Sequence, residues 1–438
     1  MFLQHLRQDQ SIPLHVVEGL LAITFLLFFL GIKGQITSYP TYCLLLLVIS
    51  SSTIRHQLRE VLRRSRIVQL GAIFHVFVLS SILWSDDISL VSGLKKALEI
   101  ALVFSFFASV ALIVYRGNVL RLYFYVIGAS VIGAALMYYD YVYNRDLYRF
   151  PWVTINGFLF TTCTLPEYAD PPQGYHQIVG CRRWYWSAHF VTGALSNPVV
   201  AASSFGLAWS LVCAALFKTN RTTIVAAGFL SMFVLWALIF LTASMGVYLG
   251  FVAILCYLMT RSKPTLAAIV AAVGIASLAV LLPGELSILP RGLSYRDQIW
   301  ADVLNRVIPE SLWFGTGIGT ASGSSISDSD LAYQHPHNIL LSAFFHVGIA
   351  GVALIFSLLL RSVFVLYELD KTSAPVAGIP FVFATGIFLV DGSLEFDKIN
   401  YIWMLFWLPI GAVAGMEARS LFRKENNSMP KNTSSQDV

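Results

Sequence analysis

The chain has 438 residues, of which 57% are hydrophobic and only 12% are charged, and its mean hydropathy is +0.70. Soluble domains carry about 25% charged residues, so this composition excludes an ordinary cytosolic enzyme, a disordered chain and a nucleic-acid-binding protein. Five cysteines are too few for a disulfide scaffold, and the net charge of +5 is small, so the placement of the basic residues matters more than their number.

Apolar runs long enough to cross a bilayer recur along the chain and predict an all-α polytopic membrane protein with about 12 transmembrane helices. The runs at 37–53 and 246–260 are short for a span. The others lie at 15–33, 67–84, 97–115, 119–141, 197–217, 222–241, 264–283, 338–360, 374–391 and 400–416. No small-residue cleavage site follows the first run, so we expect it to be a retained span.

The basic residues predict the orientation of these spans. Short cytoplasmic connections are enriched in Lys and Arg, and the even-numbered connections and the tails hold most of the 29 basic residues, including a cluster from Arg55 to Arg66. Both termini are therefore expected inside. The predicted regions are 1–141 for helices one to five, 142–196 for a first periplasmic loop, 197–283 for helices six to nine, 284–337 for a second periplasmic loop, 338–416 for helices ten to twelve, and 417–438 for a disordered cytoplasmic tail.

The first outer loop is rich in aromatic residues and arginine. Aromatic side chains anchor proteins at membrane interfaces and also form stacking platforms for sugar rings. Arginine suits phosphate oxygens, although it can equally pair with loop acids or lipid headgroups. Because every basic residue in the two long outer loops is arginine, we predict an anionic ligand that contacts Arg182 and Arg183, beside Trp184 and Trp186.

The same loop holds Cys163 and Cys181, for which an oxidising outer compartment permits a disulfide. The sequence does not decide between a bridge and two free thiols. After the loop, Ser196 or Asn197 can cap the helix that begins near Pro198, which leaves N–H groups facing an anion on the outer side.

The second outer loop contains a segment with helical periodicity at 296–308, where Ile299, Trp300 and Val303 share one apolar face. This pattern predicts a short amphipathic helix that lies on the membrane or over a cavity. The glycines that follow, at 313–320, are not a nucleotide loop, because no strand precedes them and no Walker lysine follows. They predict a tight turn close to a ligand or a neighbouring helix.

The segment His-Pro-His-Asn at 335–338 opens the tenth predicted span. Because proline disfavours helix at the residue before it, His335 belongs to the loop and His337 to the mouth of the helix. Histidine titrates near neutral pH and can act as a general base, although a structural role stays open. With Asp328 and Asp330 the two histidines also have the ligand types of a metal site, but nothing in the sequence fixes them in one geometry, so no metal is predicted.

Several loose motifs follow one another along the second half of the chain. They are Gly193…Asn197-Pro198, Leu241-Thr-Ala-Ser-Met-Gly246, Arg296-x-x-x-Trp300, Gly315-x-Gly317-x-Gly319, His337-Asn338-x-x-Leu341 and Gly348-x-x-Gly351. In order and placement they resemble the O-antigen ligase and polymerase superfamily of bacterial envelope proteins. Met245 stands where that family often has arginine, so one expected phosphate contact is missing.

The resemblance implies a glycosyltransferase of the cell inner membrane whose active site faces the periplasm. Its donor would be a glycan on undecaprenyl pyrophosphate. The acceptor would be lipid A–core for an O-antigen ligase, or another lipid-linked repeat for an O-antigen polymerase. The ligase is favoured, because a twelve-span layout with a large outer loop before the histidine fits it. The expected partners are the donor, the acceptor and membrane lipids, with no cofactor and no nucleic acid.

The candidate residues suit this chemistry, because a pyrophosphate leaving group needs cationic and N–H partners and a sugar hydroxyl needs a base. We predict His337 and Arg296 as catalytic residues. The predicted substrate-binding residues are Arg182, Arg183, Arg291, Asn338, Trp300 and Asn197. A lipid-linked glycan flippase is the alternative of another class. It would need charged residues within spans and internal repeats. The sequence shows no clear inverted repeat, and Lys95, Lys96, Glu99 and Asp391 lie near predicted span ends.

Overall fold

The computed structural model describes most of the predicted helices and the second half of the second outer loop. The described residues are 11–32, 34–85, 88–117, 119–143, 152–155, 158–161, 195, 198–217, 226–228, 230–232, 235, 246–261, 296–320, 324–325, 332–333, 335–370, 373–388, 392, 396 and 400–428. The predicted spans at 222–241 and 264–283 lie wholly or largely outside this part of the chain. Every other predicted span coincides with a helix.

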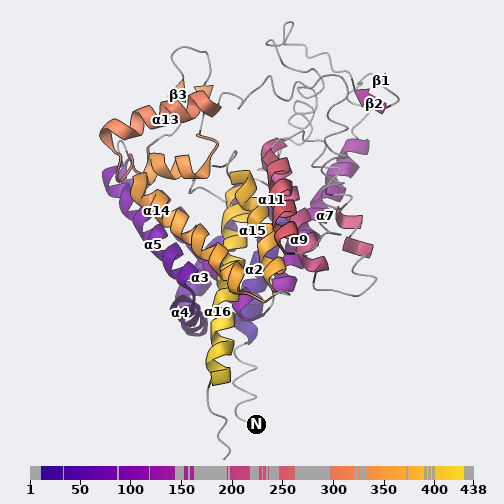
Figure 1. The fold of residues 1–438 in the computed structure, drawn as a ribbon, viewed down its shortest axis with the longest axis horizontal. Helices are drawn as coiled ribbons and strands as arrows, with labels where there is room; N and C mark the ends of the chain where they lie inside the picture. The colour runs from indigo at the N-terminus through magenta and orange to yellow at the C-terminus, as the bar shows by residue number, and fades with distance from the viewer. Residues whose placement is uncertain are drawn as a thin grey trace, which may run out of the picture.

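The described part is predominantly helical (Figure 1). Its helices are α2 Ser11–Phe29, α3 Gly34–Ser50, α4 Ser52–Arg64, α5 Arg66–Ser80 with the 3₁₀ turn η1 Ser81–Trp84, α6 Leu90–Tyr115, α7 Val119–Tyr143, α9 Pro198–Leu216, α11 Gly246–Thr260, α13 Arg296–Glu310, α14 Ile339–Glu368, α15 Ala374–Phe388, the π-helical turn η4 Trp403–Trp407 and α16 Leu408–Ser428.

Two short antiparallel strand pairs, which the sequence analysis did not predict, accompany the helices. The strand β1 (Trp152–Ile155) pairs with β2 (Phe158–Thr161), with Trp152 opposite Thr161. The strand β3 (Ser324–Ser325) pairs with β4 (Ala332–Tyr333), with Ser324 opposite Tyr333. Both pairs lie within the predicted outer loops, and the helical fold class is confirmed.

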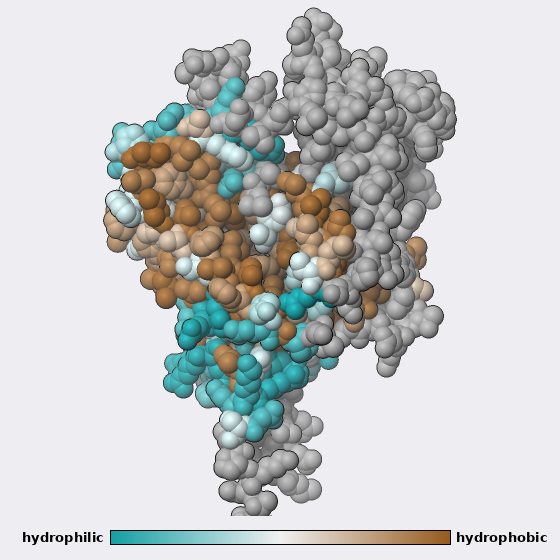
Figure 2. Space-filling model, in the orientation of Figure 1, coloured by the Kyte–Doolittle hydropathy of each residue, from teal (hydrophilic) through white to brown (hydrophobic). Residues whose placement is uncertain are grey.

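On the face that Figure 2 shows, an apolar band lies between two polar ends. Among the described residues, five helices are long and apolar enough to cross a membrane. They are Arg66–Trp84, Leu90–Tyr115, Val119–Leu136, Val199–Leu216 and Ile339–Glu368. Shorter apolar helices accompany them at Leu14–Phe29, Ile36–Ser50, Gly246–Thr260 and Ala374–Phe388. The length and composition of these helices are those of an integral membrane protein. The twelve-span layout stays a prediction.

The interior is filled by large apolar side chains, among them Trp209, Trp403 and Trp407, each at most 2% exposed. Small residues bring the packed helices close together. A Cβ on Gly415 of α16 would stand 2.4 Å from the carbonyl oxygen of Ala111 on α6, so only glycine allows this approach. The C-terminal helix is thereby held in the middle of the bundle.

Two polar segments differ from their predictions. Residues 417–428, assigned to a disordered tail, form the last turns of α16. Residues 52–64, predicted only as a basic connection, form the amphipathic helix α4, which buries Ile54, Gln57 and Val61. A single serine joins α4 to the membrane helix on either side of it. Ser51 follows α3 and caps α4, and Ser65 follows α4 and caps α5.

The two ends of the bundle carry different elements. In Figure 1 the helix α13 lies across the upper end, whereas α4 and the last turns of α16 lie at the lower end. The charged residues Lys95, Lys96 and Glu99 lie within the first three turns of α6, where Lys96 Nζ stands 3.2 Å from Glu99 Oε2. Their place near a helix end agrees with the sequence analysis, although α6 begins earlier than predicted.

Candidate functional site

His337 lies at the point where the chain turns into helix α14. Its backbone has φ 54°, which makes it the one residue other than glycine with a positive φ in the described part of the chain. This left-handed conformation is uncommon for a residue with a side chain. Asn338 follows as the N-cap, and its Oδ1 accepts hydrogen bonds from the backbone N–H groups of Leu340 at 2.9 Å and Leu341 at 3.1 Å. The cap therefore fixes the start of the helix directly beside the histidine.

The amphipathic helix α13 is confirmed and packs on the first turns of α14. Its buried Ile299, Val303 and Val307 meet Phe345 of α14 in a small apolar cluster separate from the main core. This repeated spacing of four residues is part of the apolar stripe that the sequence periodicity predicted. The cluster anchors α13 above the segment that carries the histidines.

Trp300 connects α13 to the histidine segment. Its Nε1 donates a hydrogen bond of 2.9 Å to the carbonyl oxygen of Pro336, the residue between the two histidines. Arg296 precedes Trp300 by four residues and so lies on the same face of α13. The structure therefore brings Arg296, Trp300, His337 and Asn338, four of the predicted site residues, to one end of the bundle. It also gives Trp300 a positioning contact that the sequence did not reveal.

The rings of His335 and His337 lie side by side, with centroids 4.1 Å apart, and both are half-buried. His335, which the sequence analysis assigned to the loop, thus lies directly against His337. On the opposite part of α13, Arg306 Nε stands 3.2 Å from Asp302 Oδ2, and the guanidinium lies over the Phe345 ring. Arg306 already has partners that hold it against the apolar cluster.

A break in α14 sets the direction of its first turns. Gly348 has φ 62°, and the N–H groups of Ile349 and Ala350 donate instead to the carbonyl oxygens of Leu312 and Trp313. The segment at 312–317 also donates to the carbonyl oxygens that the break sets free. Thr316 N–H bonds to Phe345 and Gly317 N–H to His346, at 2.8 and 2.9 Å. Backbone groups inside an apolar bundle need such replacement partners.

The glycine turn after α13 is confirmed as a close approach to a neighbouring helix. A Cβ on Gly315 would stand 2.4 Å from the backbone of His346, and one on Gly317 would stand 2.5 Å from Ser85. Beyond the turn, Gly319 N–H donates to Ser85 Oγ at 2.9 Å. The turn therefore joins η1, the break in α14 and the end of α13 into one framework behind the histidine segment.

The remaining predicted residues lie outside the described part of the chain. They are Arg182, Arg183, Arg291, Asn197, Cys163, Cys181, Asp328 and Asp330. Within the described residues, no group of three or more His, Cys, Asp and Glu side chains is placed to hold a metal ion. The described residues place the His337 imidazole at the mouth of α14 and Arg296 on α13, the helix that packs against α14. This arrangement suits proton removal next to an anionic group.

The comparisons with known proteins agree with the motifs. No family model matches the chain. Over 247 residues the chain is 29% identical to the O-antigen ligase of Pseudomonas aeruginosa, an alignment that covers 55% of this chain and 61% of that protein. The chain thus matches less than two thirds of the length of this relative. The resemblance to the O-antigen ligase superfamily is confirmed.

Proposed function

We propose that this protein is an O-antigen ligase, an inverting glycosyltransferase that moves a glycan from undecaprenyl pyrophosphate to lipid A–core. The observation that carries the proposal is the held geometry of His337, at the mouth of α14 and tied to α13 through Trp300 and Pro336. The sequence similarity to an O-antigen ligase supports the reaction class.

In the proposed reaction His337 takes the proton from an acceptor hydroxyl as the oxygen attacks the anomeric carbon of the donor sugar. The bond between that carbon and the pyrophosphate oxygen breaks, and its electron pair leaves with undecaprenyl pyrophosphate. Because the pyrophosphate is a good leaving group, it needs charge stabilisation rather than a proton. A direct displacement of this kind inverts the anomeric centre.

Arg296 is the proposed partner of the developing negative charge, because it lies one turn from Trp300 on the face that holds the histidine segment. We propose Arg182, Arg183, Arg291 and Asn197 as further contacts to the donor. Trp300 and Asn338, predicted to bind substrate, contribute at least by holding His337 through the contacts described above.

We place the protein in the cell inner membrane with this site facing the periplasm. The arrangement of charges supports the orientation, since the basic helix α4 and the end of α16 lie at the opposite end of the bundle from α13 (Figure 1). Single cysteines introduced at 170 and 325 should react with an impermeant thiol reagent added to intact cells. Reaction only after the inner membrane is breached would contradict the orientation.

The reaction itself is tested with purified protein, a glycan on undecaprenyl pyrophosphate, and lipid A–core. A ligase forms glycan-bearing lipid A–core and releases undecaprenyl pyrophosphate, and EDTA leaves the rate unchanged. Donor alone distinguishes the alternatives, because a polymerase lengthens the lipid-linked glycan and a flippase forms no new glycosidic bond. In cells, deletion should remove the whole lipopolysaccharide ladder, whereas loss of a polymerase leaves a single repeat.

A further inference from the structure

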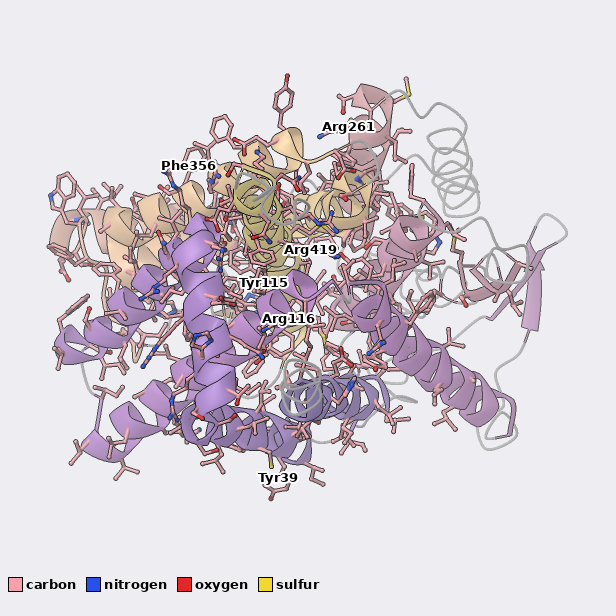
Figure 3. The ribbon with its side chains drawn as sticks, turned by 90° about the horizontal axis from the view of Figure 1, so that it is seen from below. Tyr39, Tyr115, Arg116, Arg261, Phe356 and Arg419 are labelled. Carbon is pink, nitrogen blue, oxygen red and sulfur yellow. The ribbon has the colours of Figure 1, made fainter. Side chains whose placement is uncertain are left out.

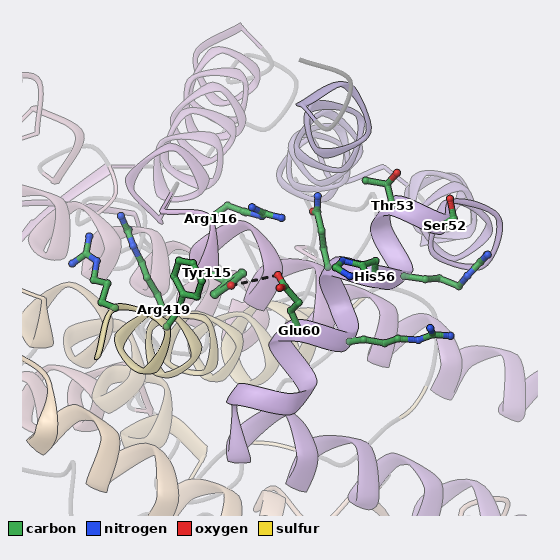
Figure 4. Close-up of a pocket in the computed structure, with 12 residues that line it drawn as sticks. Ser52, Thr53, His56, Glu60, Tyr115, Arg116 and Arg419 are labelled. Atoms are coloured by element: carbon green, nitrogen blue, oxygen red, sulfur yellow. Dashed lines mark hydrogen bonds between the residues drawn. The ribbon is translucent and has the colours of Figure 1, made fainter. Parts of the chain in front are cut away.

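A basic cavity lies at the end of the bundle opposite the histidine segment. Its volume is about 990 Å³, and it opens between α4, the C-terminal end of α6 and the last turns of α16. Figure 3 shows Tyr115, Arg116 and Arg419 close together at this end, and Figure 4 shows them facing Ser52, Thr53, His56 and Glu60 across the cavity. Its arginines are Arg55, Arg59, Arg116, Arg419 and Arg423.

The one acidic residue on the wall already has partners. Glu60 Oε2 accepts a hydrogen bond of 3.5 Å from the Tyr115 hydroxyl, and Glu60 Oε1 stands 3.5 Å from Arg64 Nη1. Among the described residues, none of the five cavity arginines forms an ion pair with a carboxylate. The cavity therefore carries an excess of positive charge that its own walls do not neutralise.

This charge is concentrated by the fold. Gly117 has φ 96°, and a Cβ there would stand 2.6 Å from the Arg419 guanidinium, so the backbone leaves room for that arginine. Burial, and then the like charge of Arg423, lower the pKa of Arg419 from its ordinary value. An anion in the cavity would relieve this repulsion.

Gln57 closes part of the cavity wall rather than its opening. It lines the cavity and is only 3% exposed, and its Oε1, which has no hydrogen-bond partner in the described part of the chain, is enclosed within the wall. The groups that a ligand in the cavity would meet are therefore the arginines, and these match a phosphate.

The location favours a lipid over a soluble phosphate ester. Because α4 is joined to the membrane helices α3 and α5 through single serines, it must lie at the membrane boundary. Basic amphipathic helices and basic pockets between membrane helices at this depth attract anionic headgroups. Phe422 and the Tyr115 ring add apolar surface to the cavity wall.

We propose that this cavity binds the phosphodiester headgroup of an anionic phospholipid from the leaflet beside α4. The proposal does not depend on the glycosyl transfer proposed for the opposite end. A lipid held there would join α4, α6 and α16 through its phosphate.

The experiment compares two double variants of the full chain in detergent. The first, Arg55→Gln with Arg59→Gln, removes two exposed cavity arginines from α4. The matched control, Arg63→Gln with Arg66→Gln, removes the same charge from neighbouring exposed positions that do not line the cavity. Native mass spectrometry follows the binding of phosphatidylglycerol and phosphatidylcholine, and size-exclusion chromatography confirms that each variant is folded.

We expect the wild-type protein to prefer phosphatidylglycerol, the cavity variant to bind it about 30-fold more weakly, and the control to change by less than about threefold. Equal losses in the two variants would overturn the proposal, because general charge attraction would then account for binding. Displacement of the lipid by millimolar glycerol phosphate would also overturn it, in favour of a soluble phosphate ester. If the cavity variant does not fold, Arg423→Gln, at an exposed cavity residue of α16, serves instead, with a selective loss of phosphatidylglycerol expected and unchanged binding as the contrary result.

Discussion

The two ends of this membrane protein are built in different ways. At the histidine end, neutral hydrogen bonds and an apolar cluster fix the backbone around His337, and a broken helix receives its missing partners from a loop. At the opposite end, charged side chains dominate, both in buried ion pairs and in a cavity whose arginines form no ion pair among the described residues. The first arrangement positions one group accurately, whereas the second attracts and holds charge.

The charged end is organised by one carboxylate. Glu417 is only 3% exposed, and its Oε1 accepts from Arg361 at 2.7 and 2.8 Å. Its Oε2 accepts from Ser65 Oγ at 2.7 Å and from the Ile67 N–H at 3.1 Å. Glu417 thereby joins α16 to α14 and to the turn between α4 and α5.

The largest effect on stability is expected at this carboxylate. Glu417→Ala leaves Arg361 without its closest partner and should lower the free energy of unfolding by about 3–5 kcal/mol. Glu425→Ala is the control, because Glu425 is about half exposed and pairs with Arg64 at the surface, where about 0–1 kcal/mol is expected. Denaturant unfolding in detergent measures both. Equal changes in the two variants would mean that Glu417 is not the organising group.

At the histidine end the backbone is the sensitive element. Gly315→Ala places a Cβ against the His346 backbone at φ 67°, so we expect a loss of about 1–3 kcal/mol in unfolding free energy and reduced glycan transfer. Gly128→Ala in α7 is the matched control, since no atom lies within 4 Å of its added Cβ. A stable, fully active Gly315→Ala protein would show that the turn does not support the site.

A smaller effect is expected where a single hydrogen bond is removed. Trp300→Phe keeps the apolar contact of α13 but loses the donation to the Pro336 carbonyl. The loss of about 0.5–1.5 kcal/mol corresponds to a transfer rate roughly 2–12-fold lower, with little change in unfolding. Trp313→Phe, at an exposed side chain, should transfer glycan at the wild-type rate. Identical rates for both variants would remove Trp300 from the positioning of His337.

The sequence was most informative where local rules decide the structure. The apolar spacing at Ile299, Val303 and Val307 predicted α13, and Pro336 predicted the helix mouth at His337. Both depend only on neighbours within a few turns.

Features that join distant segments could not be predicted in this way. The break at Gly348 depends on backbone groups at 312–317, and the basic cavity depends on α4, α6 and α16 meeting at one place. The helix α4 was missed because a search for long apolar runs passes over a short polar helix. The capping role of the Asn338 oxygen was likewise not predicted, and its contact with substrate stays a prediction.

The central claim is that His337 is the base that accepts the proton of the attacking hydroxyl. The most direct measurement is the rate of glycan transfer by purified His337→Asn, because asparagine tolerates φ 54° and so removes the imidazole without straining the backbone. We predict a rate about 10²–10⁴-fold lower, while His335→Asn keeps most of the wild-type rate. Transfer by His337→Asn at the wild-type rate, or an equal loss in both variants, would contradict the account.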